Sequence, residues 1–338
     1  MSARVVSGGL QTTVQDLGRP RTQRHAVPVG GAMDTMALRL ANVLVGNDEH
    51  AAGLEATLIG PALRFDAPAL IAIGGADLSA TIDAIPLGRW RPAFAPAGST
   101  LRFGRPEAGC RAYIAIAGGI DVPAVFDSRS TYLRAAFGGL HGRALRDGDE
   151  LRFGPPSPLS RRIADSLRDG DGSVSIARWH AGVTLRPRYS SEPFVRLLPG
   201  AHAEALDTPS RTALFGDRFR VSASSDRMGY RLEGPELRLR ERIEVLSEGV
   251  TFGTIQLPPG GAPIILMADG QTTGGYPRIA EVASVDLPLV AQLKPGDHVR
   301  FVPASLEDAQ RLYLERELEL EQMKVGLAYR LFGGGSAR

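Results

Sequence analysis

Hydrophobic positions along this chain recur mostly in short runs, a pattern that predicts strands rather than long helices. Runs at 63–65, 70–73 and 101–103 are each bounded by Gly, Pro or Asp, as is usual for strands that end in turns. A longer apolar run at 111–117 ends at a pair of glycines. We therefore expect a mainly β protein.

Two segments have helical periodicity instead. Asp34 can cap a helix whose apolar residues lie at 37, 40, 41 and 44, and Gly46 would end it. After Ser305, apolar residues recur at nearly helical spacing as far as Leu327, with glutamates on the other faces. This second pattern predicts a C-terminal amphipathic helix, which could pack on its own domain or dock onto a partner.

A turn followed by a strand ending in Arg-Phe occurs three times, at 96–103, 147–153 and 295–301. The repetition suggests two related, β-rich halves. Between them, the stretch 155–191 contains prolines expected to break regular elements, and its Asp-Gly-Asp-Gly run at 169–172 predicts a loop. We therefore expect an N-terminal domain over residues 1–190 and a C-terminal domain over residues 191–338.

Composition narrows the possible functions. The 40 Gly and 24 Pro among 338 residues favour turns, and the net charge of +2 provides no clustered basic face for nucleic acid. Cys110 is the only cysteine, and the six histidines lack metal-ligand spacing, so we expect neither a disulfide within the chain nor a metal site. The sequence shows no apolar leader and no run of 18 apolar residues, which predicts a cytoplasmic protein without a membrane span.

Two Gly/Thr-rich segments, 9–34 and 269–278, could carry chemistry, and both contain Gln-Thr-Thr. Their hydroxyl and amide groups offer neutral donors and acceptors, and the two glycines before Asp34 could present backbone N–H groups to an anion. In the second segment, Arg278 could hold a carboxylate through two hydrogen bonds, and Tyr276 could donate a proton. Ordinary turns and a Gly-rich hairpin are the alternative interpretation.

Three further polar clusters lie at 127–134, 224–231 and 247–256. Each by itself is more typical of a surface salt-bridge network than of a site. The sequence contains neither a Walker A motif nor a GxSxG nucleophile elbow. Chemistry that uses ATP would therefore require partner chains.

Taken in order, these segments resemble one family closely: the C subunit of 5-oxoprolinase, also called KipA-like or allophanate hydrolase subunit 2-like, within the biotin-dependent carboxyltransferases. The matching pieces lie at 11–19, 30–34, 54–57, 74–77, 117–120, 128–132, 225–230, 247–249 and 271–278. The resemblance implies two cyclophilin-like β-barrel domains in tandem, a few short helices, the C-terminal helix and a substrate cleft between the domains. The chain departs from the family at Arg21 and Ala26, where relatives often have Gly, and at Arg278, where they often have Lys.

The resemblance also implies an activity and partners. The chain would be one subunit, inactive alone, of a complex that opens 5-oxo-L-proline to L-glutamate with ATP. Its partners would be the A and B subunits of 5-oxoprolinase, with the KipI-like B subunit the most direct; ATP would be used by the complex, and no cofactor would be covalently bound. The alternatives are the carboxyltransferase component of a biotin-dependent urea or amide carboxylase, and a KipA-like regulatory protein that binds a kinase-inhibitor partner.

The candidate site residues come from the segments and clusters above. The candidate catalytic residues are Tyr276, Arg278, Asp226 and Glu248. The candidate substrate-binding residues are Gln11, Thr12, Thr13, Asp34, Arg129, Tyr132, Arg227, Gln256, Gln271, Thr272, Thr273, Gly274 and Gly275.

Overall fold

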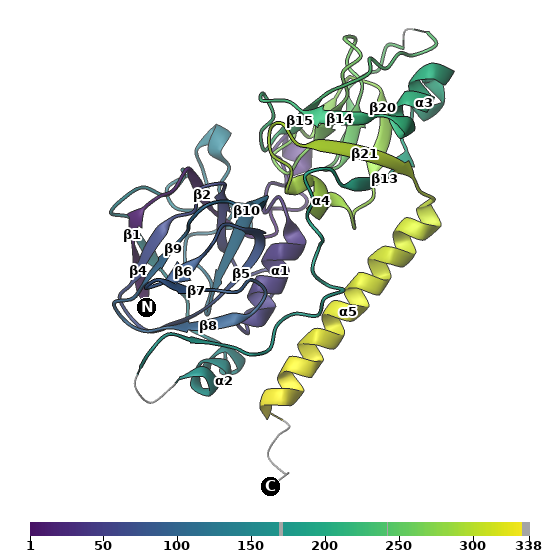
Figure 1. Ribbon diagram of the computed structural model, residues 1–338. Helices are drawn as coiled ribbons and strands as arrows, with labels where there is room; N and C mark the ends of the chain where they lie inside the picture. The colour runs from purple at the N-terminus through teal and green to yellow at the C-terminus, as the bar shows by residue number, and fades with distance from the viewer. Residues whose placement is uncertain (169–171, 242, 333–338) are drawn as a thin grey trace. The chain divides into compact units, whose positions relative to one another are not determined.

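The computed structural model describes residues 1–168, 172–241 and 243–332, which divide into two compact units (Figure 1). The first unit comprises Met1–Gly18, Asp34–Pro187 and Glu317–Arg338, and the second comprises Arg19–Met33 and Arg188–Arg316. The chain crosses between the units after residues 18, 33, 187 and 316, so both units are discontinuous in sequence. Segment 19–33 belongs with the second unit, and the last segment, from residue 317, belongs with the first.

The first unit contains two six-stranded sheets with the apolar core between them. The first sheet has the order β11-β1-β4-β9-β6-β7, and the second has the order β12-β8-β5-β10-β3-β2. Phe65 and Leu101 from the first sheet and Ile71 and Ile114 from the second meet in this core. The strands are β1 (Ser2–Ser7), β2 (Gln11–Gln15), β3 (Gly53–Thr57), β4 (Ala62–Phe65), β5 (Ala69–Asp77), β6 (Thr81–Ile82), β7 (Ile85–Pro86), β8 (Pro92–Ala95), β9 (Thr100–Arg102), β10 (Ala108–Ile116), β11 (Glu150–Arg152) and β12 (Ser175–Ile176).

Helix α1 (Thr35–Leu44) covers the outer face of the second sheet, the face that does not line the core. The Asp34 side chain accepts a hydrogen bond of 2.9 Å from the Ala37 N–H, which confirms the predicted cap. Gly74 in β5 lies directly beneath the helix, because a Cβ there would approach the Ala37 carbonyl oxygen to 2.5 Å. The glycine therefore lets helix and sheet backbones pack closely.

The expectation that the prolines of stretch 155–191 break every regular element was wrong, because the stretch contains a helix. Helix α2 (Pro158–Leu167) begins with Pro158 in its first turn, and Ser157 caps it by accepting from the Ser160 N–H. Proline is favoured at this position because the N–H it lacks would have no partner inside the helix. The predicted loop at 169–172 falls largely on residues 169–171, which lie outside the described residues.

The second unit is a closed barrel with the strand order β13-β20-β17-β18-β15-β14-β21. Met33, from segment 19–33, contributes to its core beside Phe219 and Phe301. The prediction of a mainly β protein with short helices is thus confirmed. The elements of this unit are β13 (Phe194–Pro199), α3 (Thr208–Gly216), β14 (Arg218–Val221), β15 (Gly229–Glu233), β16 (Glu248–Gly249), β17 (Thr254–Gln256), β18 (Ile264–Leu266), β19 (Thr273–Gly274), β20 (Arg278–Val282), α4 (Leu287–Ala291) and β21 (His298–Pro303), with short 3-10 turns at Gln23–His25 and Ala203–Ala205. The 3-10 turn Leu133–Ala135 belongs to the first unit.

The repeated turn-and-strand motif has the same conformation in both units. Its glycines, Gly98, Gly148 and Gly296, have φ angles of 82°, 87° and 93°. In each copy the glycine N–H donates to a carbonyl oxygen of a core strand, at Phe65, Val5 and Val221 respectively. The motif therefore opens strands β9, β11 and β21 alike, and its glycine is required because L side chains are strained at these angles.

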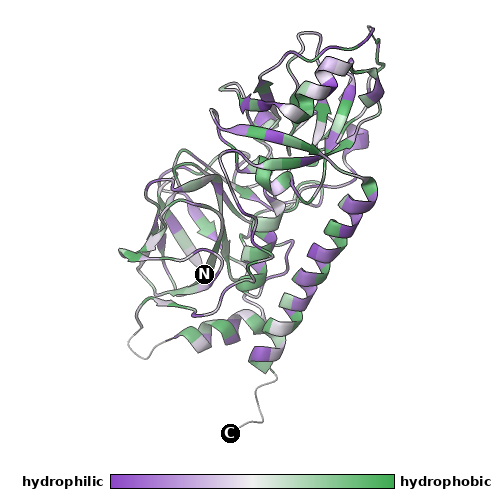
Figure 2. Ribbon diagram, turned by 45° about the vertical axis from the view of Figure 1, so that its right-hand side comes forward, coloured by the Kyte–Doolittle hydropathy of each residue, from purple (hydrophilic) through white to green (hydrophobic). Residues whose placement is uncertain are grey.

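The predicted C-terminal helix is α5 (Leu306–Phe332), and its first part belongs to the second unit and its remainder to the first. It carries apolar as well as charged residues along its length (Figure 2). Ala309, Leu320 and Leu327 form its buried stripe. Among the helices of the described chain, none has the length and apolar character that crossing a membrane requires.

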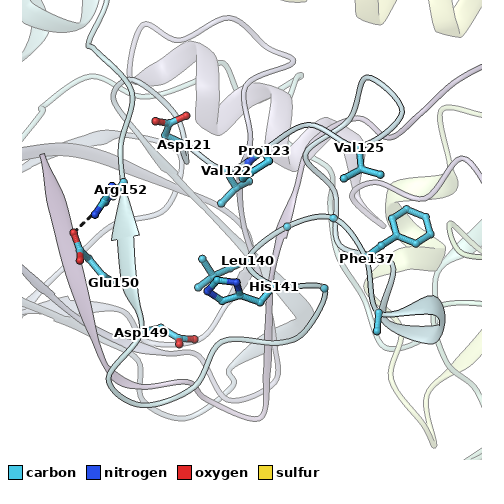
Figure 3. Close-up of a pocket in the computed structure, with 14 residues that line it drawn as sticks. Asp121, Val122, Pro123, Val125, Phe137, Leu140, His141, Asp149, Glu150 and Arg152 are labelled. Atoms are coloured by element: carbon cyan, nitrogen blue, oxygen red, sulfur yellow. Dashed lines mark hydrogen bonds and ion pairs between the residues drawn. The ribbon is translucent and has the colours of Figure 1, made fainter.

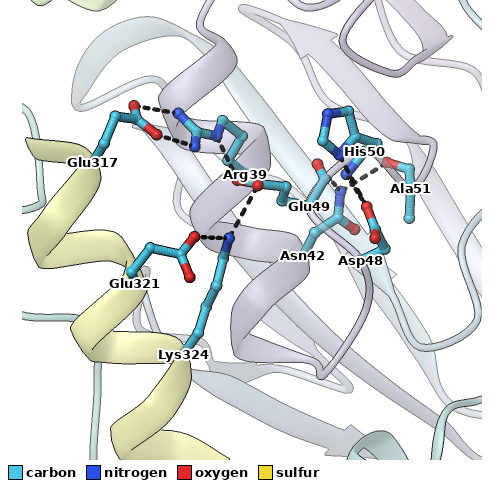
Figure 4. Close-up of polar contacts among 9 residues, drawn as sticks. All are labelled: Arg39, Asn42, Asp48, Glu49, His50, Ala51, Glu317, Glu321 and Lys324. Carbon is cyan, nitrogen blue, oxygen red and sulfur yellow. Dashed lines mark hydrogen bonds and ion pairs between the residues drawn. The ribbon is translucent and has the colours of Figure 1, made fainter. Parts of the chain in front are cut away.

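An ion-pair network ties the second half of α5 to the rest of the first unit (Figure 4). Arg39 in α1 donates to both carboxylate oxygens of Glu317, at 2.7 and 2.5 Å, and to Glu49 at 2.7 Å. Lys324 donates to Glu49 at 3.0 Å and to Glu321 at 2.6 Å. Glu49 thus joins two cations from different elements.

We expect this network to weaken in acid. Burial raises the pKa of Glu49, but hydrogen bonds from Lys324 and Arg39 outweigh burial and leave the pKa below its ordinary value. A lowered pKa stabilises the folded chain above the ordinary glutamate value of about 4.3, and this contribution is lost as the pH falls through the lowered pKa. Protection factors of the amides along residues 317–330, measured relative to the intrinsic exchange rate at each pH, should therefore fall below about pH 4.

Glu49→Gln is the matched control for that measurement. It should cost roughly 1 kcal/mol at neutral pH and reduce the acid sensitivity of these amides. Equal acid sensitivity with and without Glu49 would show that another group controls the docking of the helix.

Candidate functional site

The second Gly/Thr-rich segment follows β18 and forms a loop and the short strand β19 before β20 begins. Strand β19 pairs with β16, so that Glu248 lies opposite Gly274 and Gly249 opposite Thr273. The Val250 N–H also donates to the Thr272 carbonyl at 3.1 Å. This pairing brings the predicted clusters 247–256 and 269–278 together.

A buried ion pair holds the base of this loop. Arg227 donates to the carboxylate of Asp269 from Nε at 2.8 Å and from Nη2 at 3.0 Å, and the two side chains are only 8% and 6% exposed. Arg227 also donates to the Gly31 carbonyl at 2.6 Å, and the Gly30 N–H donates to the Ala268 carbonyl at 3.0 Å. The Arg227–Asp269 pair therefore fixes part of the first Gly-rich segment against the second.

The two segments line one pocket of about 260 Å³ in the second unit. Segment 19–33 contributes backbone around Gly30, and the second segment contributes Gln271 and Thr272. The polar side chains in its wall are the neutral amides and hydroxyls of Gln23, Thr251, Gln271 and Thr272. The lining residues are Gln23, Pro28, Val29, Gly30, Val250, Thr251, Phe252, Leu266, Met267, Ala268, Gly270, Gln271 and Thr272.

Two of the three departures from the family pattern fall where the backbone is left-handed. Arg21 has a φ angle of 78° and Ala26 a φ angle of 58°. Glycine adopts such angles without strain, whereas residues with a Cβ do so uncommonly. The first loop therefore keeps a glycine-like backbone at both positions although its side chains differ.

Arg278 forms an ion pair at the edge of the second segment. Its Nε donates to Glu248 at 2.7 Å, and this hydrogen bond lowers the pKa of Glu248. The backbone N–H of Arg278 donates to Nδ1 of His202 at 3.1 Å. Arg278 is thus a partly exposed guanidinium with further N–H donors available to a ligand.

Two glutamines lie between the pocket and this edge. Gln271 donates to Oε1 of Gln256 at 3.4 Å, and Gln256 in turn lies 3.5 Å from the carbonyl oxygen of Tyr276. A Cβ at Gly274 would approach Nε2 of Gln256 to 2.4 Å, so glycine leaves room for both amides. The structure therefore brings Gln256, Gln271, Gly274 and the Arg278 loop together.

Other predicted residues have different surroundings. Asp226 is exposed and accepts from the N–H groups of Met228 and Gly229, at 2.8 and 3.3 Å, which caps a turn. Tyr276 is 42% exposed and does not line the pocket. Thr273 and Gly275 are exposed on the same loop.

Of the predicted residues in the first unit, Arg129 lies beside Asp16, which was not among the candidates. Asp16 accepts from Ser128 Oγ at 2.7 Å, Ser130 Oγ at 2.5 Å and the Arg129 N–H at 2.6 Å. The Arg129 side chain instead donates to the Val122 carbonyl at 3.0 Å. The sequence feature that could have indicated Asp16 as a hydrogen-bond acceptor is its position directly after the Gln-Thr-Thr-Val-Gln run.

Strand β2 presents the first Gln-Thr-Thr run. Gln11 is half-buried, whereas Thr12 and Thr13 are buried. Nε2 of Gln15, at the end of the strand, donates to Thr13 Oγ1 at 3.0 Å. The ring of Tyr132 packs edge-on against Phe137, 5.5 Å away.

A buried chain of hydrogen bonds links Asp34, Tyr113 and Glu55, and the sequence analysis did not predict it. The Tyr113 hydroxyl accepts from the Asp34 N–H at 2.8 Å and donates to Glu55 Oε2 at 2.7 Å. Burial, with the charges of Glu55 and Asp34, raises the pKa of Tyr113 well above its ordinary value, so the phenol stays neutral. Tyr113 lies in a strand whose neighbouring residues are apolar, so no indication of its hydrogen bonds was visible in the sequence.

The first unit also contains a pocket of about 580 Å³ formed by the loops around 121–125 and 136–142 and by β11 (Figure 3). Its polar side chains include Asp121, His141 and the ion pair between Glu150 and Arg152, whose atoms are 3.3 Å apart. Phe137 borders the pocket, but neither Arg129 nor Tyr132 lines it. Its mixed charges contrast with the neutral polar groups of the pocket in the second unit.

Known proteins are similar to this chain in both sequence and fold. The family described as carboxyltransferase domain, subdomains A and B, matches residues 25–303. The chain is 39% identical to the 5-oxoprolinase C subunit of Escherichia coli over 97% of this chain and 98% of that protein, and 35% identical to the Haemophilus influenzae protein of the same name over 93% and 95%. The K. lactis urea amidolyase structure superposes with a TM-score of 0.85 at 31% identity, covering 95% of this chain but only 20% of that one.

These matches run along nearly the whole chain and agree with the order of the motifs. They also agree with the mainly β architecture. The chain therefore belongs to the carboxyltransferase-domain family, together with the 5-oxoprolinase C subunits and the matching region of urea amidolyase.

Proposed function

We propose that this chain is the C subunit of an ATP-dependent 5-oxoprolinase complex, in which it helps to open 5-oxo-L-proline to L-glutamate together with the A and B subunits. The observation that carries this proposal is the match to a 5-oxoprolinase C subunit over 97% of this chain and 98% of the relative. The urea amidolyase of Saccharomyces cerevisiae matches over only 17% of its length. The match thus covers almost all of a 5-oxoprolinase subunit but only a small part of a urea amidolyase.

The pocket of the second unit suits a planar cyclic amide. A lactam offers one N–H donor and one carbonyl acceptor, and Gln271, Thr272 and Thr251 supply neutral partners for both. The carboxylate of 5-oxoproline would require a cation, and Arg278 is the partly exposed guanidinium on the same loop. Glu248 orients that guanidinium through Nε and leaves its remaining N–H groups for a ligand.

In this proposal Tyr276 acts at the proton transfers that accompany opening of the ring. Breaking the lactam C–N bond releases an amine that must gain a proton, and a phenol can donate one when it is placed within hydrogen-bond distance. The exposure of Tyr276 leaves it accessible to a bound substrate. ATP chemistry is assigned to the complex as a whole, and no covalently bound cofactor is proposed for this chain.

Reconstitution tests the proposal. The chain is mixed with candidate A and B subunits, ATP and 5-oxoproline, and glutamate is measured over time. We expect glutamate only when all three chains are present. Glutamate formed equally fast without this chain would refute the proposal.

A carboxyltransferase role is the second candidate, favoured by the TM-score of 0.85 to a urea amidolyase structure. It would require a separate biotin carrier that delivers a carboxyl group to urea or a related amide. The discriminating measurement is transfer of labelled carboxyl from a carboxylated biotin carrier to urea. Transfer by this chain, together with failure of the glutamate assay, would select the carboxyltransferase.

A further inference from the structure

Helix α5 is apolar on two opposite faces, although a surface helix ordinarily presents polar residues to water. One face carries the buried stripe of Ala309, Leu320 and Leu327. At 100° per residue, five exposed apolar residues fall within an arc of about 60° on the opposite face. One of them, Phe332, is covered by the Arg162 guanidinium at 4.1 Å from its ring centroid. The other four, here called the outer stripe, are Leu314, Leu318, Val325 and Tyr329, which are 65%, 60%, 68% and 75% exposed.

The spacing of the outer-stripe residues is the same in both directions along the helix. Its residues are separated by four, seven and four positions, so the pattern is symmetric about the midpoint between Glu321 and Gln322. A twofold axis through that midpoint would place a second helix antiparallel to the first. Leu314 would then face the copy's Tyr329, and Leu318 would face the copy's Val325.

This symmetric spacing indicates that the outer stripe contacts a second copy of the same chain. A twofold interface requires that when residue i contacts residue j, residue j of the copy also contacts residue i. The spacing satisfies that condition for all four residues of the outer stripe. An unrelated partner would place no such condition on the sequence.

The polar groups near the axis are compatible with the same pairing. Glu321 would lie opposite the copy's Gln322, whose amide can donate to a carboxylate. Glu321 is already paired with Lys324 at 2.6 Å, so the axis would not bring two uncompensated carboxylates together. An apolar groove of about 630 Å³, lined by Leu198, Phe252 and Val282, borders Leu314 and would receive the copy's Tyr329 at its rim.

We propose that the outer stripe of α5 is a self-association surface, through which two copies of this chain pair with their helices antiparallel. Four apolar side chains per copy bury less than the roughly 800 Å² per partner of a standard interface, so the pairing is a weak one. It is independent of the proposed activity.

Sedimentation velocity of the purified chain, up to about 100 µM, tests the proposal, since weak interfaces require such concentrations. The weight-average mass should rise toward twice the 36.0 kDa of one chain. Leu318→Glu alone and Val325→Lys alone should each keep the mass near that of one chain. The double variant should restore association, because each new carboxylate would face a new ammonium of the copy.

Leu246→Glu is the matched control, since Leu246 is an apolar residue with 90% exposure that lies outside α5. It should leave association unchanged, and circular dichroism should show the same helix content in every variant. A chain that stays monomeric throughout this range overturns the proposal. So does association that the single variants leave intact or that the double variant fails to restore. If Leu318→Glu instead reduces only the capture of another 5-oxoprolinase subunit by a monomeric chain, the stripe serves that subunit and self-association is refuted.

Discussion

Replacing Asp269 by asparagine is expected to lower the free energy of unfolding of the second unit by about 3–5 kcal/mol. The reason is that Arg227, whose side chain is 8% exposed, would lose the two charge-assisted hydrogen bonds that it donates to the Asp269 carboxylate. Removing one partner of a buried ion pair is strongly destabilising, whereas replacing both partners by apolar residues is often nearly neutral. The same change should loosen segment 19–33, which Arg227 holds through the Gly31 carbonyl.

Amide hydrogen exchange of β18, β20 and the Gly30 N–H is the suitable measurement. Tryptophan fluorescence would report on the wrong unit, because both tryptophans, Trp90 and Trp179, lie in the first. The expected change is faster exchange at these amides in the Asp269→Asn variant.

Two further variants separate the buried charge from a general effect of mutation. Glu233→Gln breaks an exposed pair with Arg220 in the same barrel and should cost less than about 1 kcal/mol. Arg227→Met combined with Asp269→Leu removes both charges and should cost much less than Asp269→Asn alone. If Asp269→Asn costs no more than Glu233→Gln, the pair does not hold the pocket as the geometry indicates.

Arg278→Ala is expected to reduce kcat/KM of the reconstituted complex by roughly 10–100-fold, the range that follows from losing one hydrogen bond to a charged group. The loss should appear mainly in KM if Arg278 holds the substrate carboxylate in ground and transition states alike. Arg278→Lys should restore part of the activity, since an ammonium keeps the charge but not the planar fork. The measurement is initial glutamate production against 5-oxoproline concentration.

Arg220→Ala supplies the control for that experiment, because Arg220 also pairs with a glutamate on the same barrel but is exposed and lies outside the pocket. Its kcat/KM should match the unchanged chain. Tyr276→Phe tests the proton transfer separately and should lower kcat rather than raise KM. If both Arg278→Ala and Tyr276→Phe lower only the yield of folded protein, with unchanged activity per folded molecule, the loop is structural and the proposed roles are wrong.

The elements that the sequence predicted best are those with local signals. Asp34, the apolar spacing and Gly46 together placed α1, and the periodicity after Ser305 placed α5. Each signal lies within a few turns of the element it specifies, so no distant contact was needed. Helix α2 was missed because prolines were interpreted as breakers, although Pro158 occupies the first turn where proline is favoured.

The candidate site was predicted only in part. The Gln/Thr character of the pocket was visible in the two segments, and the Glu248–Arg278 pair lies within predicted clusters. Asp269 and Asp16 were not chosen, because an isolated acid in a Gly-rich loop does not reveal its partner. Tyr113 and Glu55 were hidden within strands whose other residues are apolar.

The sequence by itself determined the mainly β character, the two principal helices and the family, because composition, periodicity and motif order are properties of the chain alone. Only the tertiary structure decided that Arg227 pairs with Asp269, 42 residues away, and with Gly31, 196 residues away. It also decided that segment 19–33 packs with the second unit. These contacts depend on how the barrel closes, and barrel closure brings together positions whose separation along the chain follows no local period.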